Sequence, residues 1–292
     1  MKVAIFSKSI PQSDDRYIQQ IVTSLEARKA SLLVYEPFYQ KIRDRIEFAA
    51  EPSLFRSHKD ISRGVECLLS IGGDGTLLDT ISLVRDYGIP ILGINLGRMG
   101  FLSSISKERI EPALDKLFHK HYSLDQRVLI RLESTSDLFG DMNYALNEVS
   151  IYRKSPLSML KIEAWVNDEF LNSYWADGLI VSTPTGSTAY SLSNGGPIIL
   201  PGSSNFVITP IATHNLTVRP IVIPDSSTIR IRVVGRISEF HINLDSHSAL
   251  TDSSVEFTII KEKFNINLVQ LEGESYFKTI REKLMWGLDI RN

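Results

Sequence analysis

The sequence is poor in the features that mark several classes of protein. It has one cysteine in 292 residues, Cys67, which excludes a disulfide within the chain. No apolar run approaches the roughly 20 residues that span a bilayer, and the apolar start Met1–Phe6 is too short for a signal peptide. The 32 Lys and Arg against 34 Asp and Glu give a net charge of −2, without the basic excess of a nucleic-acid binder. We therefore expect a cytoplasmic protein whose partners include neither nucleic acid nor a membrane.

The first 122 residues alternate short apolar runs with segments of helical periodicity. Hydrophobic residues make up 43% of the chain and charged residues 23%, which is typical of a soluble globular protein. Alternating strands and helices imply crossover connections and a mostly parallel sheet. The expected strands are Val3–Phe6, Leu32–Tyr35, Val65–Ile71 and Pro90–Ile94. The expected helices follow Ser13, span Leu77–Arg85 and follow Ser106, with both serines as N-caps. Residues 1–122 are predicted to form a doubly wound α/β domain.

From about residue 123 the pattern changes to short β-rich runs. The expected strands are Val128–Glu133, Tyr144–Tyr152, Ser158–Val166, Phe170–Trp175, Leu179–Val181, Phe206–Ile211, Thr228–Val234, Glu239–Asn243 and Val255–Ile260. The segment Val166–Glu169 is typical of a hairpin turn. Residues 123–270 are therefore predicted to form a β-rich, β-sandwich-like domain. A helix over Tyr276–Met285 is expected in the C-terminal segment, residues 271–292.

A glycine-rich turn, Gly72-Gly73-Asp74-Gly75-Thr76, directly follows the expected strand that ends at Ile71. Open α/β sheets bind ligands beyond the carboxyl ends of their strands, and glycines there let backbone N–H groups approach phosphate oxygens. A carboxylate among phosphate-binding glycines is unfavourable unless it has a function, such as holding a metal or accepting a proton. The alternative is a tight strand-to-helix turn in which Asp74 caps the helix. Leu78 stands where the dinucleotide fingerprint has its third glycine, and no Walker-type P-loop is present.

The segment Asp177–Pro197 is dense in hydroxyl groups. It begins on an expected strand, turns, and then suits a short helix capped by Ser187 or Thr188 and closed by Gly195-Gly196. Hydroxyls and free helix N–H groups suit phosphate, ribose or adenine edges, and Tyr190 can stack on a base or pack in a core. A solvated surface turn is the alternative, which suits poorly a segment that interrupts a buried strand.

An amide and a carboxylate, Asn147 and Glu148, stand side by side within the expected strand Tyr144–Tyr152. Neighbouring residues of a strand point to opposite faces, so one side chain could bind a ribose diol while the other supports the adjacent loop. A partly exposed edge strand is the alternative interpretation of this pair.

Taken together and in this order, these motifs strongly resemble the ATP–NAD kinase family. The motifs that carry the resemblance are Gly72–Thr76, Gly93–Leu102, Asn147-Glu148, Asp177–Pro197, Asp245-Ser246 and Ser275–Phe277. They cover nearly the whole chain. The GGDGT motif alone is shared with diacylglycerol, sphingosine and phosphofructokinase-type kinases, whereas the long hydroxyl-rich segment is far more specific.

The resemblance implies transfer of the γ-phosphoryl group of ATP to the 2′-hydroxyl of the adenosine ribose of NAD. It also implies a last helix that returns to the N-terminal domain, and a homodimer or homotetramer. Asp74 matches the family's proton acceptor. The residues expected to bind substrate or cofactor are Gly73, Gly75, Asn147, Glu148, Asp177, Thr185, Thr188, Ala189, Tyr190 and Ser193.

Three further expected binding residues depart from or vary within the family pattern. Trp175 stands where some bacterial members carry a basic residue, and Ser158 where some have His or Arg. His247 follows Asp245-Ser246 where many members have Gln. These positions bear on contacts to the nicotinamide side of the dinucleotide and leave the transfer chemistry untouched.

The glycine-rich turn contains no Lys or Arg, so backbone N–H groups and a metal must meet the phosphate charge. A divalent cation, magnesium, is therefore expected with the ATP phosphates, and no protein ligand is assigned to it. Cys67 is expected to be a buried small hydrophobe, and the six histidines show no zinc-type spacing.

Two alternatives come from other functional classes. A lipid kinase of the diacylglycerol type would share GGDGT but would need an apolar acceptor pocket, and no amphipathic basic stretch is evident. A non-catalytic dinucleotide sensor could keep the same pocket, although binding alone does not require the Asp74 carboxylate.

Overall fold

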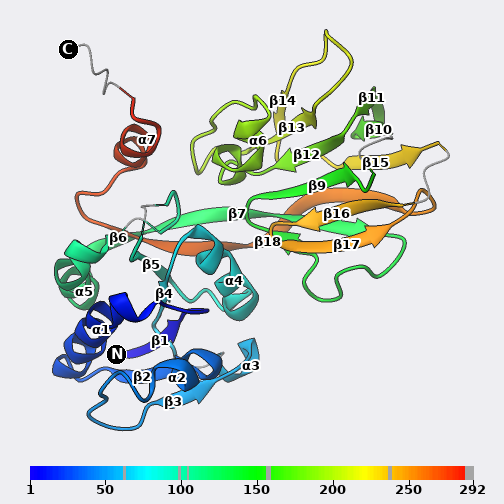
Figure 1. The fold of residues 1–292 in the computed structure, drawn as a ribbon. Coiled ribbons are helices and arrows are strands. Elements are labelled where there is room, and N and C mark those ends of the chain that lie inside the picture. The colour runs from blue at the N-terminus through cyan, green and yellow to red at the C-terminus, as the bar shows by residue number, and fades with distance from the viewer. Residues whose placement is uncertain (62–63, 98–99, 104, 156–158, 236–238, 287–292) are drawn as a thin grey trace. The chain divides into compact units, whose positions relative to one another are not determined.

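The computed structural model describes residues 1–286 except 62–63, 98–99, 104, 156–158 and 236–238. The chain divides into two compact units (Figure 1). Unit 1 comprises Met1–Gln126 together with the chain from Ile266 onward, and unit 2 is Arg127–Asn265. Unit 1 is thus discontinuous in sequence. The domain ranges expected from the sequence stay predictions.

Unit 1 is built on a parallel sheet with strand order β5-β4-β1-β2-β3. The strands are β1 (Lys2–Phe6), β2 (Ser31–Tyr35), β3 (Ser53–Phe55), β4 (Cys67–Ile71) and β5 (Ile91–Asn95). Every residue of β4 and β5 is buried, as expected for strands covered on both faces, and this explains their continuous apolar sequence. The short β6 (Ile105–Ser106) extends beyond β5.

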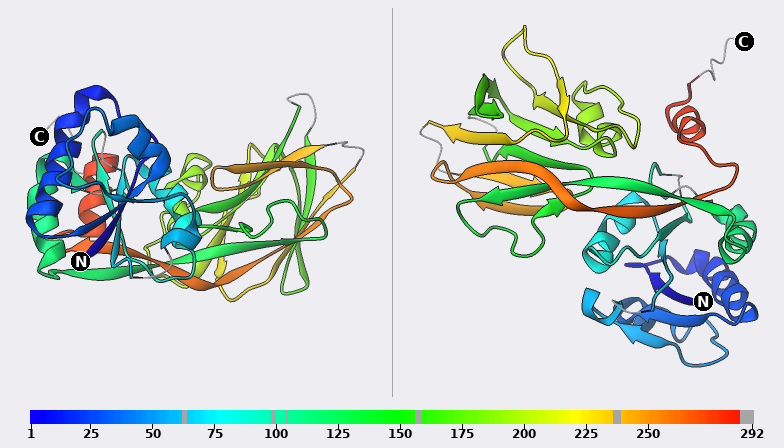
Figure 2. Two further views of the ribbon diagram at one scale, coloured as in Figure 1. Left: turned by 90° about the horizontal axis from the view of Figure 1, so that it is seen from below. Right: turned by 180° about the vertical axis from the view of Figure 1, so that it is seen from behind.

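Helices cover both faces of this sheet. The helices of unit 1 are α1 (Asp15–Ala27), α2 (Glu36–Ile42), α3 (His58–Ile61), α4 (Asp74–Val84), α5 (Ile110–Phe118) and α7 (Tyr276–Leu284), with 3-10 turns at Gln12–Asp14 and Lys107–Arg109. Figure 2 shows α1 and α5 together on one side of the strands and α4 on the other. The apolar face of α1, which includes Ile18 and Ile21, joins the buried core. The predicted doubly wound α/β class is confirmed.

Unit 2 contains two groups of strands that share one core. One sheet has the order β14-β13-β12-β9-β16-β17, and the other group has the order β11-β10-β15-β18. The strands are β7 (Tyr122–Ser134), β8 (Tyr144–Ala145), β9 (Glu148–Arg153), β10 (Leu160–Val166), β11 (Glu169–Ala176), β12 (Gly178–Ser182), β13 (Asn205–Ile211), β14 (Ile221–Pro224), β15 (Ile229–Val234), β16 (Phe240–Leu244), β17 (His247–Thr251) and β18 (Glu256–Leu271). The first residues of β7 and the last residues of β18 belong to unit 1.

The core of unit 2 is formed by the alternate, inward-facing residues of its strands. Burial alternates residue by residue along β10, β15 and β16, so each strand turns one face inward. Phe206 and Phe240 from one sheet share a buried cluster with Ile162 and Phe257 from the other group of strands. This confirms the predicted β-sandwich-like class.

Several local expectations are corrected or confirmed by the backbone. Ser13 lies inside the 3-10 turn Gln12–Asp14, and neither Ser13 nor Ser106 makes a side-chain cap bond. The predicted hairpin is confirmed, because Asn167 and Asp168 both have positive φ between β10 and β11. Helix α7 lies within the predicted range, and Ser275 caps it by accepting a hydrogen bond from Lys278 N–H at 3.2 Å.

We expect Phe257→Ala to destabilise the protein by about 3–5 kcal/mol, because it empties a fully buried site whose ring packs edge-on against Phe240. The matched control is Leu216→Ala in the same unit, where the side chain is exposed, and its cost should stay below about 0.5 kcal/mol. Urea denaturation followed by tryptophan fluorescence measures both. Equal costs for the two substitutions would contradict the core assignment.

Candidate functional site

The glycine-rich turn of unit 1 lies where β4 ends and α4 begins. Gly72 has a φ of +148°, and a Cβ there would meet the Thr76 side chain. Gly73 is the N-cap residue of α4, and Asp74 is its first helical residue. The turn therefore lies beyond the carboxyl end of a buried parallel strand, next to a helix N-terminus. The alternative reading of Asp74 as the capping residue is wrong.

The Asp74 carboxylate accepts hydrogen bonds from three consecutive backbone N–H groups. Phe101 N donates to Oδ2 at 2.7 Å, while Leu102 N and Ser103 N donate to Oδ1 at 3.0 and 2.9 Å. Gly100 packs so closely that a Cβ there would collide with this carboxylate. The carboxylate thus fixes the turn that follows β5. Since Oδ1 already accepts two bonds and Oδ2 one, Oδ2 retains acceptor capacity for one further group.

In unit 2, Asn147 lies between two strands rather than within one. Strand β8 ends at Ala145 and β9 begins at Glu148, so the predicted continuous strand Tyr144–Tyr152 is wrong. The edge-strand alternative is also wrong, because β9 lies between β12 and β16. The Asp245 carboxylate breaks the strand by accepting hydrogen bonds from three consecutive N–H groups. These are Leu146 N at 2.8 Å, Asn147 N at 2.8 Å and Glu148 N at 3.1 Å.

The hydroxyl-rich segment supports the same turn from the other side. Thr183 N donates to the Asn147 carbonyl at 2.9 Å, and Thr183 Oγ1 donates to the Leu146 carbonyl at 2.5 Å. Gly186 passes so close to Asn147 that a Cβ at position 186 would collide with its backbone. Segments far apart in the sequence therefore hold the two candidate side chains of Asn147 and Glu148 in place.

The predicted caps of the short helix in this segment are wrong. The segment forms a 3-10 turn (Gly186–Thr188) and then α6 (Tyr190–Ser193). Ser187 Oγ donates to the Pro184 carbonyl at 2.6 Å, and Thr188 Oγ1 donates to the Thr185 carbonyl at 3.2 Å. Both hydroxyls therefore close the turn itself. Gly195 has positive φ just after α6, as expected for a helix end.

A pocket of about 400 Å³ in unit 2 brings several candidate residues together. Glu148, Ser150 and Tyr152 line it from one face of β9, since they alternate along the strand. The other lining residues are Arg153, Asp177, Tyr190, Ile211, Asn243 and Asp245. Four of the predicted or motif residues, Glu148, Asp177, Tyr190 and Asp245, thus share one cavity.

Sequence reasoning missed several residues of this pocket. Asn243 Nδ2 donates to Ser150 Oγ at 3.1 Å, and Tyr152 stacks on His241 with ring centroids 4.9 Å apart. Arg153 forms an ion pair with Asp177 at 2.8 Å. The period-two spacing from Glu148 to Tyr152 was the available signal for Ser150 and Tyr152. No local signal exists for Asn243, which reaches the pocket through strand pairing.

Burial raises the pKa of two acids of the pocket, Glu148 and Asp245. One carboxylate oxygen of Glu148 accepts the backbone N–H of Tyr190, while Oε2 is buried and has no hydrogen-bond partner in the described structure. Burial, and then the neighbouring Asp245 carboxylate, raise the pKa of Glu148 to about 8. Both effects favour the neutral form of this carboxyl group in the ligand-free protein.

The remaining candidates lie in different surroundings. Thr185 is buried and accepts a hydrogen bond from the buried Arg127 at 3.2 Å, a contact that the sequence did not suggest. Thr188 and Ala189 are half-buried, and Ser193 is exposed. Trp175 and His247 have exposed side chains and do not line the pocket. Ser158 lies outside the described residues.

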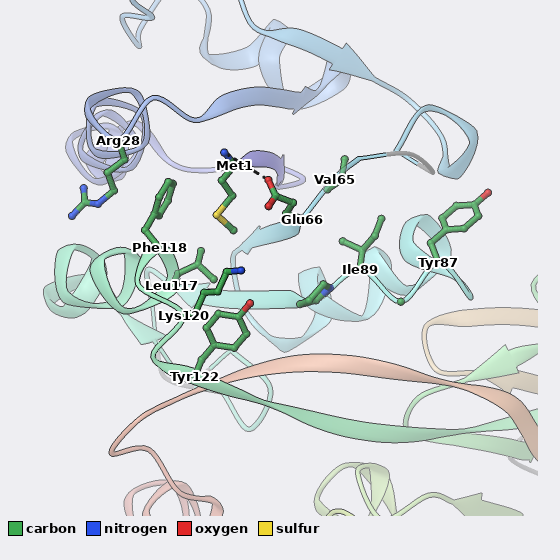
Figure 3. Close-up of a pocket in the computed structure, with 12 residues that line it drawn as sticks. Met1, Arg28, Val65, Glu66, Tyr87, Ile89, Leu117, Phe118, Lys120 and Tyr122 are labelled. Atoms are coloured by element: carbon green, nitrogen blue, oxygen red, sulfur yellow. Dashed lines mark ion pairs between the residues drawn. The ribbon is translucent and has the colours of Figure 1, made fainter.

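A second pocket, of about 520 Å³, lies at the amino-terminal ends of the strands of the sheet in unit 1 (Figure 3). Met1, Glu66 and Pro90, which precede β1, β4 and β5, line it, and the Met1 ammonium pairs with Glu66 at 3.6 Å. It contains no candidate residue, since the glycine-rich turn follows the opposite end of β4.

Two further sequence readings concern cysteine and membrane helices. Cys67 is fully buried, and burial raises the pKa of its thiol to about 12, which confirms that it is a buried small hydrophobe. Among the helices described, none has the length and apolar character needed to cross a bilayer. Within the same residues, His, Cys, Asp and Glu side chains form no group of three that could hold a metal ion.

Comparisons with known proteins converge on one family. The family model of the ATP-NAD kinase N-terminal domain matches residues 5–122, and that of the ATP-NAD kinase C-terminal domain matches residues 146–271. The chain is 44% identical over 294 residues to the NAD kinase of Flavobacterium psychrophilum, covering 100% of both chains. It is 36% identical over 291 residues to the NAD kinase of Bacteroides fragilis, again covering 100% of both.

Solved structures are similar over the full chain. Yeast NADH kinase complexed with NADH superposes with a TM-score of 0.87 at 25% identity, covering 100% of this chain and 89% of the yeast chain. An NAD kinase from Archaeoglobus fulgidus in complex with ATP gives a TM-score of 0.73 at 24% identity, covering 98% and 99%.

We expect Asp74→Ala to accelerate amide hydrogen exchange at Phe101, Leu102 and Ser103 at least about tenfold, because their common acceptor is removed. Exchange measured by NMR or mass spectrometry reports this directly. Asp86→Asn, at an exposed position of the same unit, is the control and should leave these amides unchanged. Unaltered exchange in Asp74→Ala would mean that the turn holds its conformation without the carboxylate.

Proposed function

The chain belongs to the ATP-NAD kinase family, and on that basis we propose roles for its residues in the reaction. The protein is an ATP-dependent NAD kinase, which transfers the γ-phosphoryl group of ATP to the 2′-hydroxyl of the adenosine ribose of NAD and gives NADP. The observation that carries this conclusion is the full-length match at 44% identity, over a chain whose candidate pocket is lined by the family's motif residues.

Asp74 is proposed to accept the proton of the attacking hydroxyl. Phosphoryl transfer passes through a loose transition state, so a weak base suffices if proton loss comes late and the hydroxyl is held within hydrogen-bond reach. The contacts favour Oδ2 as the accepting atom, since Oδ1 already accepts two N–H groups and Oδ2 only one. Gly73 and Gly75, which flank this carboxylate, are proposed to offer backbone N–H groups to phosphate oxygens.

The pocket of unit 2 is proposed to bind the adenosine half of the dinucleotide. Asn147 and Glu148 would contact ribose or base, Asp177 would lie near the bound dinucleotide, and the 44% exposed ring of Tyr190 is free to stack on the base. The 3-10 turn and α6 would supply polar contacts to adenine and ribose through Thr185, Thr188, Ala189 and Ser193. His247, Trp175 and Ser158 are proposed to bear on the nicotinamide side.

Magnesium is proposed to enter with ATP. Mg²⁺ is commonly held by substrate phosphates and water together with few protein ligands. The ion would neutralise phosphate charge in a turn that has no Lys or Arg of its own. A cytoplasmic location is likewise proposed for the enzyme.

A homodimer or homotetramer formed through unit 2 is proposed from its outer strands. Strands β14, β17 and β11 each stand at the end of a strand order, and each exposes large apolar side chains. These are Val222 on β14, Leu250 on β17 and Phe170 on β11, each at least 42% exposed. Unpaired edges with apolar side chains are usually covered by another chain.

The reaction and the role of Asp74 are tested together. Purified protein with ATP and Mg²⁺ should convert NAD to NADP and leave diacylglycerol unphosphorylated. Asp74→Asn should lower kcat by about 10²–10⁴-fold while NAD affinity stays within about tenfold, because the residue acts on the proton rather than on binding. An Asn amide oxygen can still accept the N–H groups of Leu102 and Ser103, so the turn is largely kept.

Steady-state kinetics and calorimetry measure the two quantities, with Asp86→Asn as the control. A variant that retains more than about a tenth of the wild-type kcat would remove Asp74 from the proton-acceptor role.

Sedimentation velocity at micromolar concentration tests the assembly. We expect a dimer or tetramer, and we expect Leu250→Glu or Val222→Glu to weaken it, because a charge cannot be buried in an apolar contact without a partner. Thr23→Glu, at an exposed position of α1 in unit 1, is the control and should leave the assembly intact. A fully active monomer would contradict the proposal.

A further inference from the structure

The turn Leu146-Asn147-Glu148 has a hydrogen bond on every backbone polar group. Its three N–H groups donate to the Asp245 carboxylate. The carbonyls of Leu146 and Asn147 accept from Thr183, and the carbonyl of Glu148 accepts from Asp245 N at 3.1 Å. Asp245 thus bonds this turn with both its side chain and its backbone. The position of the Glu148 side chain follows from these contacts.

Asp245 itself is held in an uncommon conformation. It lies in the tight turn between β16 and β17, where Leu244 pairs with His247, and its φ is +50°. Its Oδ1 accepts two N–H groups and its Oδ2 accepts one. Three N–H donors stabilise the ionised form of a carboxyl group. Burial raises the pKa of Asp245, but its three N–H donors and His247 oppose that rise, whereas Glu148 has one N–H donor and the Asp245 carboxylate as its neighbour. We therefore assign the negative charge of the pair to Asp245.

Among the residues that the structure describes, the Lys and Arg side chains that line the pocket leave no cation to neutralise a second charge on Glu148. Arg153, the Arg that lines the pocket, is paired with Asp177 at 2.8 Å. Tyr190 of α6 offers its backbone N–H to one oxygen, and Oε2 lies buried without a partner. The other titratable groups nearby are Tyr152 of β9, His241 of β16 and the exposed His247 of β17. An ionised Glu148 would thus stand beside an ionised Asp245.

We propose that Asp245 is a positioning residue that holds Glu148 in the dinucleotide pocket as a neutral carboxyl group, whose O–H donates a hydrogen bond to the bound ligand. The acceptor is a ribose oxygen or an adenine ring nitrogen of NAD, so this inference deepens the proposed function and rests on it. Burial and the Asp245 charge raise the pKa of Glu148 to about 8, which keeps the proton in place at neutral pH.

The sign of the pH dependence follows from this assignment. Below pH 8 the carboxyl group can donate, and above pH 8 it loses its proton and repels Asp245. The dissociation constant for NAD should rise about tenfold between pH 7 and pH 9, because the competent fraction of the protein falls by that factor. Calorimetric titration across pH 6–9.5 measures the profile.

Variants of Glu148 test whether its side chain donates a hydrogen bond to NAD or accepts one. Glu148→Gln keeps an N–H donor, so it should bind NAD within about threefold of wild type at pH 7 and with no rise at pH 9. Glu148→Ala should weaken binding at least tenfold at every pH. If the Glu148 carboxylate instead accepts hydrogen bonds, wild-type affinity would not fall between pH 7 and 9 and Glu148→Gln would bind at least tenfold more weakly at pH 7. That result would overturn the proposal.

Variants of Asp245 test its positioning role. Asp245→Asn removes the neighbouring charge, so the midpoint of the wild-type pH profile should move down by at least about one pH unit. Asp252→Asn is the matched control, since Asp252 is another turn carboxylate of unit 2 that accepts N–H and O–H groups, here from Ser254. It should leave the midpoint in place. An unchanged midpoint in Asp245→Asn would also overturn the proposal.

The pH dependence of stability, measured without NAD, tests the neutral state of Glu148 independently of NAD binding and of the kinase reaction. Glu148 ionises near its ordinary pKa of 4.5 in the unfolded chain but near 8 in the folded one, so wild-type stability falls as pH rises through this window. Glu148→Gln should match the urea midpoint of wild type at pH 4.5 and exceed it at pH 9. Absence of NAD binding together with this stability difference would refute the dinucleotide role and retain the neutral carboxyl. Equal midpoints at pH 9 would refute the neutral carboxyl.

Discussion

A carboxylate that accepts three consecutive backbone N–H groups is the interaction on which both candidate sites depend, one in each unit. Asp74 collects Phe101 to Ser103, and Asp245 collects Leu146 to Glu148. The residues joined are 27 to 29 positions apart in the first case and 97 to 99 in the second. Each carboxylate therefore replaces local backbone pairing with a long-range anchor. Without it, three buried or half-buried N–H groups would be left unpaired.

The two carboxylates, Asp74 and Asp245, also determine which backbone N–H groups remain able to bind an anion. Successive N–H groups form a concavity that attracts anions, and phosphate-binding loops use the same geometry. Here the protein's own carboxylates fill two such concavities. The backbone of the Phe101–Ser103 turn is therefore committed to Asp74, and phosphate oxygens must find their donors elsewhere. In unit 2 the filled concavity places the Asp245 carboxylate beside Glu148, and burial together with this neighbour raises the pKa of the Glu148 carboxyl group.

The sequence predicted those features whose cause is local. The continuous apolar runs of β4 and β5 follow from burial on both faces, and the Asn167-Asp168 hairpin follows from two residues that tolerate positive φ. Helix α2 (Glu36–Ile42) was missed because it is seven residues long and follows β2 without a turn signal. The strands β14 and β17, of four and five residues, were missed for the same reason of length.

The sequence predicted which residues are site candidates better than it predicted how the backbone positions them. The motifs indicated Asp74, Glu148 and Asp177 as candidate site residues, but Asn147 was placed inside a strand because the carboxylate that interrupts that strand is far away in the chain. The expected capping roles of Ser187 and Thr188 were wrong because both hydroxyls donate hydrogen bonds to nearby backbone carbonyls instead. Ser150 and Asn243 reach the pocket through strand register, which no single segment encodes.

The discontinuity of unit 1 has a consequence for synthesis on the ribosome. Strand β5 pairs with β18 through Ile91 and Leu268, and Val269 and Leu271 lie in the core of unit 1. These residues leave the ribosome only after all of unit 2 has been made. Domains emerging from the ribosome fold as their residues become available. The nascent α/β sheet must therefore wait, with the flank of β5 uncovered, while the inserted β-rich unit is completed, and this interval is when the chain most needs protection from aggregation.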